Sequence, residues 1–263
     1  RSLIDVTDLL EFLQRQESVS GVQRVIAETA PILLHESPST RAVILDRSRG
    51  VFVELTADEV ELLIGRGASA AHAETDRALL ADAATAALTR ARDAVPCRLD
   101  AATVMVFLGA VWINDALMLA ARDAHAAGAQ CIYLLYDLTP VLETGHTAAV
   151  NRLFDRYLRL ITQTGCAVPA ISQSSRTDYE TYCDERGESA PRGGVTGLPC
   201  GLSPDQFDTA ESPWPRPYAL FVGTVEARKN HALALRAWQS LIERHGADHV
   251  PDLVCIGRLG WHS

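Results

Sequence analysis

The chain has 263 residues, of which 48% are hydrophobic and 22% are charged, and its formal net charge is −9. This composition is that of a globular protein with room for one large or two small domains. The negative charge argues against a broad nucleic-acid-binding surface, and no apolar run is long enough to span a bilayer.

The six cysteines are scattered, and none forms a C-x-x-C pair. This spacing predicts neither structural zinc nor a disulfide framework, so we expect no metal site. It favours a reducing cytoplasm. The chain starts at Arg1 without a recognisable signal peptide. We therefore expect a cytoplasmic protein, and peripheral contact with the inner face of the membrane stays open.

The first hundred residues predict a mixture of helices and strands. Residues 9–13 and 22–34 have helical patterns and are joined by a polar turn at 16–21. Residues 41–45 and 51–55 are typical of two strands around the turn 46–50. The alanine-rich stretch 68–92 predicts a helix with a polar outer face.

The rest of the chain alternates strands and helices. Short apolar runs predict buried parallel strands at 103–108, 131–136, 167–172, 218–222 and 253–256. Helices are predicted between them at 114–127, 147–164, from 174 onward, and at 230–245. They stop at Gly128, Gly165, Gly187 and Gly246, because glycine accepts the left-handed conformation at a helix end. The alternation predicts a Rossmann-like, doubly wound α/β sheet.

Residues 209–217 contain three prolines and no periodic pattern, which indicates a stiff linker. We therefore expect a first domain at 1–208 and the beginning of a second at 218–263. Two strands and one helix are too few to bury a core of their own. The second domain is accordingly expected to be incomplete in this chain.

The loop at residues 223–231 predicts a site for an anionic phosphate group. Gly223 follows a strand, and a helix begins near Asn230 or His231. Ligands bind outside the carboxyl ends of such strands, and a helix N-terminus offers unpaired N–H groups to an anion. Arg228 and Lys229 add two positive charges. The alternative is a solvated loop whose Arg and Lys face water.

A second loop, 257–261, also follows a predicted strand. Its glycines would allow tight backbone approach, and Trp261 could stack on a base or a sugar. An ordinary turn with a packed tryptophan explains the same residues equally well.

These segments resemble a known family. Residues 222–231 (VGTVEARKNH) and 254–261 (VCIGRLGW) resemble the start of the donor domain of family 4 glycosyltransferases, which have the GT-B fold. The resemblance extends to five further segments, at residues 4–10 (IDVTDLL), 20–25 (SGVQRV), 135–140 (LYDLTP), 171–175 (ISQSS) and 199–202 (PCGL). It is weakest between residues 51 and 99.

The resemblance implies two Rossmann-like domains facing each other across a cleft. It implies a retaining, metal-independent transferase of the hexosyltransferase type, with a nucleotide-diphosphate sugar as donor and no other cofactor. The acceptor would be a glycan, a lipid-linked molecule or a small molecule. Arg228 and Lys229 would be the catalytic residues, because they would neutralise the charge that grows on the departing diphosphate.

The same resemblance assigns Gly21, Gly223, Thr224 and Gly257 to the donor side. For Gly21, a helix boundary is nearly as good an explanation.

On the acceptor and sugar side we place Asp137, His146 and Trp112. Each has a structural alternative: capping of a loop for Asp137, a surface position for His146, and packing at the rim of the core for Trp112. Ser174 and Ser175 are predicted first as a helix N-cap.

Relatives carry two glutamates, separated by seven residues, later in the donor domain, and this sequence has no counterpart. We therefore expect the 263-residue chain alone to transfer no sugar. The alternative function is a noncatalytic or truncated relative that binds a sugar or a protein. A third reading, a sugar-nucleotide epimerase, would require a G-x-x-G-x-x-G motif after the first strand, and none is present near the N-terminus.

Overall fold

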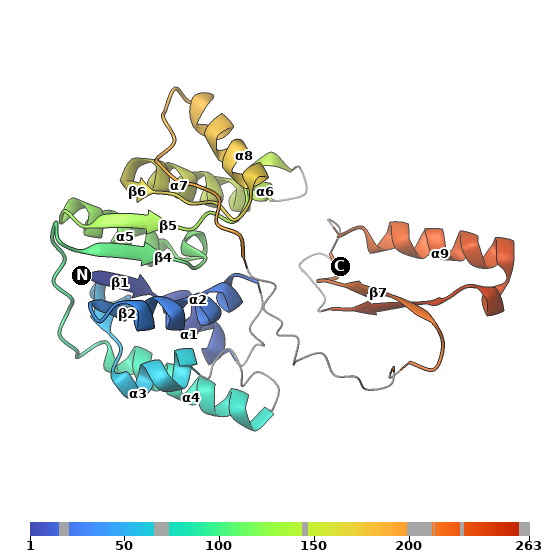
Figure 1. Cartoon of the computed structure of the whole chain (residues 1–263), viewed down its shortest axis with the longest axis horizontal. Coiled ribbons are helices and arrows are strands. Elements are labelled where there is room, and N and C mark those ends of the chain that lie inside the picture. Colours follow the sequence, from blue (N-terminus) through green and yellow to red (C-terminus); the bar gives the residue numbers. More distant parts are fainter. Residues whose placement is uncertain are drawn as a thin grey trace. The chain divides into compact units, whose positions relative to one another are not determined.

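The computed structural model describes residues 1–15, 21–65, 74–143, 147–198, 212, 214–226 and 229–257. The chain divides into two compact units, Arg1–Gly201 and Leu202–Ser263 (Figure 1). Residues 209–211 and 213 of the predicted linker lie outside the described residues. Each unit is described below by itself.

Unit 1 is built on a six-stranded sheet with the order β3-β2-β1-β4-β5-β6. Neighbouring strands are parallel except β2 and β3, which form an antiparallel hairpin. The strands are β1 (Ser2–Asp5), β2 (Thr40–Asp46), β3 (Val51–Glu54), β4 (Val104–Phe107), β5 (Gln130–Tyr133) and β6 (Gly165–Ala167). This is the expected Rossmann-like α/β architecture, with a mixed, mostly parallel sheet.

Helices cover both faces of this sheet. One buried apolar cluster joins the sheet to α1, α2 and α4, and the other joins it to α5, α7 and α8. The helices are α1 (Thr7–Gln14), α2 (Val22–Glu36), α3 (Ala57–Glu59), α4 (Glu74–Arg90), α5 (Asp115–Ala126), α6 (Thr139–Leu142), α7 (Ala148–Thr164) and α8 (Gln173–Asp184). Short helical segments of other pitch are η1 (Val60–Gly65) and η2 (Val111–Ile113). Among the described helices, none is both long and apolar enough to cross a membrane.

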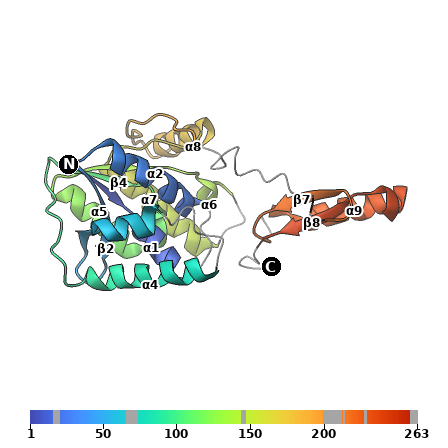
Figure 2. The same ribbon diagram turned by 60° about the horizontal axis from the view of Figure 1, so that its bottom comes forward.

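Unit 2 contains a two-stranded parallel sheet of β7 (Tyr218–Val222) and β8 (Asp252–Ile256), which lie side by side in Figure 2. They are connected through α9 (His231–His245) and the short turn η5 (Ala247–His249). The predicted burial of both strand faces is wrong for β7 and for β8, because neither strand contains a buried residue. The side chains of β7 alternate, and Leu220 is 51% and Val222 68% exposed. In the described part of the unit, α9 provides cover for only one face.

The left-handed conformation predicted for the glycine stops is confirmed at Gly128, Gly187 and Gly246, which have positive φ angles. The helix α7 also stops at Gly165 as predicted, but the predicted cause is wrong there, because Gly165 has φ −72° and opens β6. A Cβ atom at this residue would lie 2.5 Å from the carbonyl oxygen of Ile161. Glycine is thus required there because a side chain would collide with the backbone, and not because the residue has a left-handed conformation.

The strand predicted at 167–172 is displaced. β6 ends at Ala167, and only Ala170 continues the pairing, through isolated bridges to Leu135 and Val195. The sequence pattern also gave no strand at residues 2–5, whereas β1 lies at the centre of the sheet. Its run of apolar residues is only two long, which is too short for a periodic pattern to identify.

Candidate functional site

The strand order of unit 1 reverses between β1 and β4, because β2 lies on one side of β1 and β4 on the other. Ligands of open α/β sheets bind at such a reversal, outside the carboxyl ends of the strands. In this chain the residues at that position are the end of β1 with the segment that follows it, at residues 5–11, and the segment after β4, at residues 108–114.

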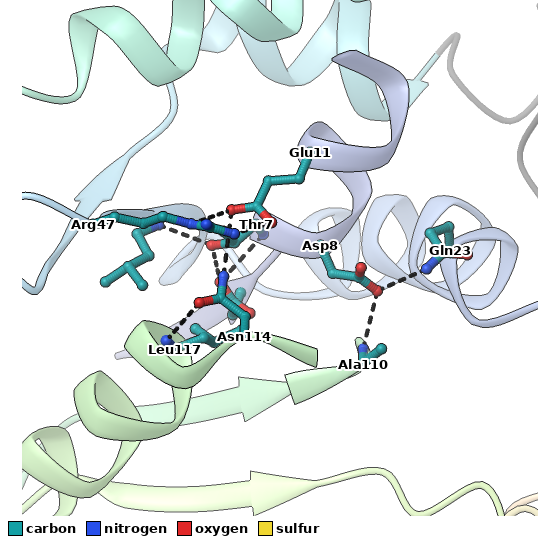
Figure 3. Close-up of polar contacts among 10 residues, drawn as sticks. Thr7, Asp8, Glu11, Gln23, Arg47, Ala110, Asn114 and Leu117 are labelled. Atoms are coloured by element: carbon teal, nitrogen blue, oxygen red, sulfur yellow. Dashed lines mark hydrogen bonds and ion pairs between the residues drawn. The ribbon is translucent and has the colours of Figure 1, made fainter. Parts of the chain in front are cut away.

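Asp8, in the segment after β1, forms a hydrogen bond to the segment after β4 (Figure 3). Its Oδ2 accepts hydrogen bonds from the backbone N–H of Ala110 and from Nε2 of Gln23, both at 3.0 Å. A Cβ atom at Gly109 would lie 3.0 Å from Cβ of Asp8, so the approach depends on the glycine. Burial raises the pKa of Asp8 even though the two hydrogen bonds favour its charged form. The carboxylate fixes the β1 and β4 loops against α2.

Asp5, the last residue of β1, is fully buried. Its Oδ1 accepts from the backbone N–H of Thr7 at 3.2 Å and from the Thr7 hydroxyl at 2.5 Å, while Oδ2 has no partner among the described residues. The same hydroxyl accepts from the N–H of Leu45 at 2.8 Å. Burial raises the pKa of Asp5 to about 7. The carboxyl group therefore titrates near neutral pH at the carboxyl end of the central strand.

Glu11 extends this polar cluster toward β2. Its two oxygens accept from Nε and Nη2 of Arg47 at 2.7 and 2.5 Å, and Asn114 lies at 3.4 Å from Oε1 (Figure 3). A hollow of about 580 Å³ opens beside the ion pair, and Arg15, Asp46 and Arg92 also line it. The hollow lies where β2 ends, so a polar ligand of unit 1 could enter it.

Replacing Asp8 by alanine is expected to destabilise unit 1. The change leaves the Ala110 N–H and the Gln23 amide without their acceptor in a buried position. A buried donor that loses its partner costs about 1–3 kcal/mol. Urea unfolding followed by circular dichroism measures the loss. Asp123→Ala is the matched control, because Asp123 is exposed and pairs with the adjacent Arg122. An equal loss in both variants would contradict the assigned role of Asp8.

Two of the predicted unit 1 residues have a structural explanation. Gly21 precedes α2 with φ 55°, in the left-handed region, and its missing Cβ would meet nothing within 4 Å. The helix boundary thus accounts for this glycine. The exposed Asp137 accepts from the N–H of Thr139 at 3.0 Å through Oδ1, which is the capping alternative. Contact of either residue with donor or acceptor stays a prediction.

Trp112 lies at the rim of the core. Its ring packs against Phe154 and Tyr157, with centroids 5.4 and 5.3 Å away, and more distantly against Tyr136. These aromatic contacts explain the residue by packing, and stacking on a sugar stays a prediction. The other predicted residue of this group, His146, lies outside the described residues.

The predicted N-cap of α8 is two to three residues too late. Ser172 is the N-cap, and its Oγ accepts from the N–H of Ser175 at 3.1 Å. The Ser175 hydroxyl is used differently: it donates to the carbonyl oxygen of Tyr136 at 2.6 Å. Ser174 lies inside the helix. The serine pattern identified the cap motif but not the serine that supplies it.

In unit 2, the carboxyl ends of β7 and β8 are in close backbone contact. The N–H of Gly223 donates to the carbonyl oxygen of Ile256 at 2.9 Å. A Cβ atom at Gly257 would lie 1.8 Å from the carbonyl oxygen of Gly223. Gly257 therefore allows close backbone approach, as predicted. The backbone that approaches it is that of Gly223, at the end of β7. Thr224 follows as an exposed residue.

The helix α9, which follows β7 in the chain, begins beside Lys229. Asn230 caps α9 in a left-handed conformation with φ 54°, and its Oδ1 accepts from the N–H of Leu233 at 3.2 Å. Lys229 is exposed, and within the described part of the chain its ammonium group has no ion pair. Arg228 lies outside the described residues. Lys229 and the helix N-terminus thus present positive charge at the same place.

His231, the first residue of α9, is only 9% exposed and stacks on Phe221, with ring centroids 4.2 Å apart. The sequence interpretation placed His231 at the end of the predicted phosphate loop but gave its side chain no role. It likewise gave none to Asp5 and Asp8. The signal for the two aspartates is their position directly after a strand, which becomes visible only once residues 2–5 are recognised as β1.

Comparison with protein families, with characterised proteins and with solved structures finds no match for this chain. Its fold and its site therefore rest on its own residues.

Proposed function

We propose that this protein is a retaining, metal-independent glycosyltransferase of the GT-B type. It would move a sugar from a nucleotide-diphosphate sugar to a hydroxyl group of a glycan, a lipid-linked molecule or a small molecule. The proposal combines the resemblance of several segments to family 4 glycosyltransferases with the arrangement of residues at the start of α9. The described cysteines are free thiols, which agrees with a cytoplasmic place of action.

The observation that carries the proposal is the convergence at the carboxyl ends of β7 and β8. The chain runs from the tightly packed end of β7 to the N-terminus of the 15-residue helix α9, and Lys229 stands immediately before the cap of that helix. Unpaired N–H groups, the helix dipole and a lysine together favour an anion such as a diphosphate.

The chemistry follows from the change in charge during transfer. When the bond between the sugar and the donor phosphate breaks, negative charge builds up on the diphosphate. Positive groups at the start of α9 would stabilise this charge more strongly in the transition state than in the bound donor. Lys229 supplies one such group, and Arg228 is proposed as the other. Unit 1 would hold the acceptor, and we propose the hollow beside Glu11 and Arg47 as its place.

Lys229→Ala is expected to weaken the binding of nucleoside diphosphates by about tenfold. A hydrogen bond to a charged group contributes about 1.5–3 kcal/mol, which corresponds to a factor of about ten or more in affinity. Isothermal titration calorimetry with UDP, GDP and TDP measures the effect and also identifies the base. The double change of Arg228 and Lys229 to alanine is expected to abolish binding.

Arg244→Ala is the matched control for this experiment. Arg244 lies in the last turn of the same helix, about 20 Å from its start at 1.5 Å per residue, so the control removes an equal charge away from the proposed site. Affinity that is unchanged in the Lys229 variant, or that falls equally in the control, would exclude the proposed diphosphate site. Binding without sugar transfer would favour the noncatalytic alternative.

A further inference from the structure

The hollow beside Glu11 and Arg47 is lined by charged side chains from three parts of unit 1. These parts are the end of α1, the end of β2 with the turn that follows it, and the end of α4. The hollow has a volume of about 580 Å³. Sites for small molecules have volumes of about 300–1,000 Å³, so this hollow is large enough for one. Its charged residues are Glu11, Arg15, Asp46, Arg47 and Arg92.

Both carboxylates of the hollow already have cationic partners. Glu11 accepts from Nε and Nη2 of Arg47 (Figure 3). The side chain of Asp46 is 2% exposed, is paired with Arg49, and also accepts from the backbone N–H and the hydroxyl of Ser48. Neither carboxylate therefore requires a further cation from the hollow.

Two arginines of the hollow have no such partner. Arg15 directly follows α1 and Arg92 lies just beyond α4, and both are exposed. Neither forms an ion pair with any residue that the structure describes. The lining thus has one more positive charge than negative charges, and Arg49 adds another, in a chain whose net charge is −9. This local excess of positive charge favours an anion.

The hydroxyl groups of the hollow supply no free donor. The Ser48 hydroxyl donates to Asp46 at 2.7 Å, and the Thr89 hydroxyl donates to the carbonyl oxygen of Thr85 at 2.8 Å. The charged donors left for a ligand are therefore those of the arginines. A carboxylate or a phosphate offers only acceptors, and one guanidinium group can bind two of its oxygens at once.

The helix dipole gives a second explanation for both arginines. Arg15 and Arg92 each stand at the carboxyl end of a helix, where a positive charge is stabilising. This role accounts for each arginine along its own helix. It requires no hollow between them, and it predicts that their loss affects stability and leaves ligand binding unchanged.

We infer that the hollow binds an anionic group of the acceptor, a carboxylate or a phosphate, through Arg15 and Arg92. This inference rests on the proposed function, in which unit 1 holds the acceptor. It narrows the acceptor to molecules with an acidic group, such as an acidic sugar, a sugar phosphate or a lipid phosphate. Arg15 and Arg92 are binding residues in this assignment, because they hold the acceptor and take no part in breaking the bond to the donor.

Inorganic phosphate and acetate are the two probes, added separately to the wild-type chain. The titration is carried out at low ionic strength, because salt screens exposed charges. The Nε–H resonances of Arg15 and Arg92 in ¹⁵N spectra report on the hollow, so phosphate that binds near Lys229 does not disturb the measurement. Both resonances are expected to shift to saturation with at least one probe. The probe that binds more tightly distinguishes a phosphate from a carboxylate. Resonances that respond to neither probe overturn the inference.

Arg92→Gln removes one charge and keeps a polar side chain. The affinity for the better probe, followed on the Arg15 resonance, is expected to fall about fivefold, which is the upper range for an exposed ion pair. Arg15→Gln, followed on the Arg92 resonance, is expected to give the same loss. A melting temperature that falls while the affinity stays unchanged would show that these arginines act only on the helix ends.

Arg77→Gln is the matched control. Arg77 lies near the beginning of α4, about 20 Å from the end of that helix at 1.5 Å per residue, so the control removes an equal charge away from the hollow. Its affinity for the probe is expected to equal that of the wild type. An equal loss in Arg77→Gln and Arg92→Gln would mean that net charge and not the hollow determines binding, and would overturn the inference.

The outcomes separate this inference from the proposed function. If neither probe shifts the arginine resonances while Lys229→Ala weakens the binding of nucleoside diphosphates, the donor site stands and only the anionic acceptor is wrong. If the probes bind in the hollow but the wild-type chain binds no nucleoside diphosphate, the proposed function fails and the hollow is an anion site without a role in sugar transfer. If both ligands bind and both arginine variants weaken the probe alone, both proposals are supported.

Discussion

Asp5→Asn is expected to remove most of the pH dependence that Asp5 gives to the stability of unit 1. In the folded chain the pKa of Asp5 is raised from 3.8 to about 7, and the largest cause is burial. Between these two values the folded state keeps a proton that the unfolded chain has released. The free energy of unfolding of the wild-type chain therefore falls as pH rises from about 4 to about 7.

The size of this contribution is set by the shift. A shift of about three pKa units corresponds to about 4 kcal/mol at 1.36 kcal/mol per unit. Asparagine keeps an acceptor for the N–H and hydroxyl of Thr7 and does not ionise, so the loop geometry is retained. Urea unfolding at several pH values from 4 to 8 measures the difference between variant and wild type. That difference is expected to favour the variant increasingly as pH rises.

Other carboxyl groups also make the stability depend on pH, which is why the comparison with wild type is needed. The pKa of Asp8 is also raised, whereas those of Asp46 and Asp155 are lowered by their arginine and hydroxyl partners. The lowered groups contribute stability that is lost as pH falls. Asp137→Asn, at an exposed position, is the control. Wild-type and Asp5→Asn curves that stay parallel across the pH range would show that Asp5 is ionised in the folded chain.

Gly257→Ala is expected to disrupt both the strand ends of unit 2 and the proposed diphosphate site. The new methyl group would lie 1.8 Å from the carbonyl oxygen of Gly223 and 2.6 Å from its carbonyl carbon, both backbone atoms that cannot rotate away. Relieving such overpacking costs roughly 1–3 kcal/mol or more. The shift also moves the loop before α9, so pyrophosphate affinity should fall about tenfold, as for loss of one charge-assisted bond.

The matched control for this change is Gly223→Ala. It adds the same methyl group on the other side of the contact, where no atom lies within 4 Å. We expect its stability to stay within about 0.5 kcal/mol of wild type. Hydrogen exchange of the β7 and β8 amides reports on the strand ends directly. Slow exchange retained in Gly257→Ala would mean that the backbone accommodates the methyl group without opening the strands.

The sequence predicted the parts of the fold that have a repeated pattern. β4, β7 and β8 and the helices α5 and α9 agree with prediction to within about two residues, because apolar runs and helix ends carry local signals. β1 and the displacement of β6 could not be predicted in this way. Their pairing depends on strands that are distant in the chain, such as β4 for β1.

The candidate site was predictable only in its local components. The loop before α9 could be predicted as an anion site because a glycine, two cationic residues and a helix start follow one another in the sequence. The burial of Asp5 and the bond from Ala110 to Asp8, which joins residues 102 positions apart, result from packing that no local pattern encodes. Gly257 was predicted to allow close approach, but the sequence could not tell that Gly223 occupies the space.

The hairpin of β2 and β3 has a practical consequence for experiments on unit 1. β3 runs antiparallel to β2 and therefore ends at the edge of the sheet where the parallel strands begin. The segment before β4 lies at this same edge, because the N-terminal amino group of Arg1 donates to the carbonyl oxygen of Ala102 at 2.8 Å. The Arg98 side chain in this segment is 89% exposed. A tether to a sensor surface at position 98 would therefore hold unit 1 from the edge opposite Asp5 and Asp8, leaving the carboxyl-end loops open to ligands in solution.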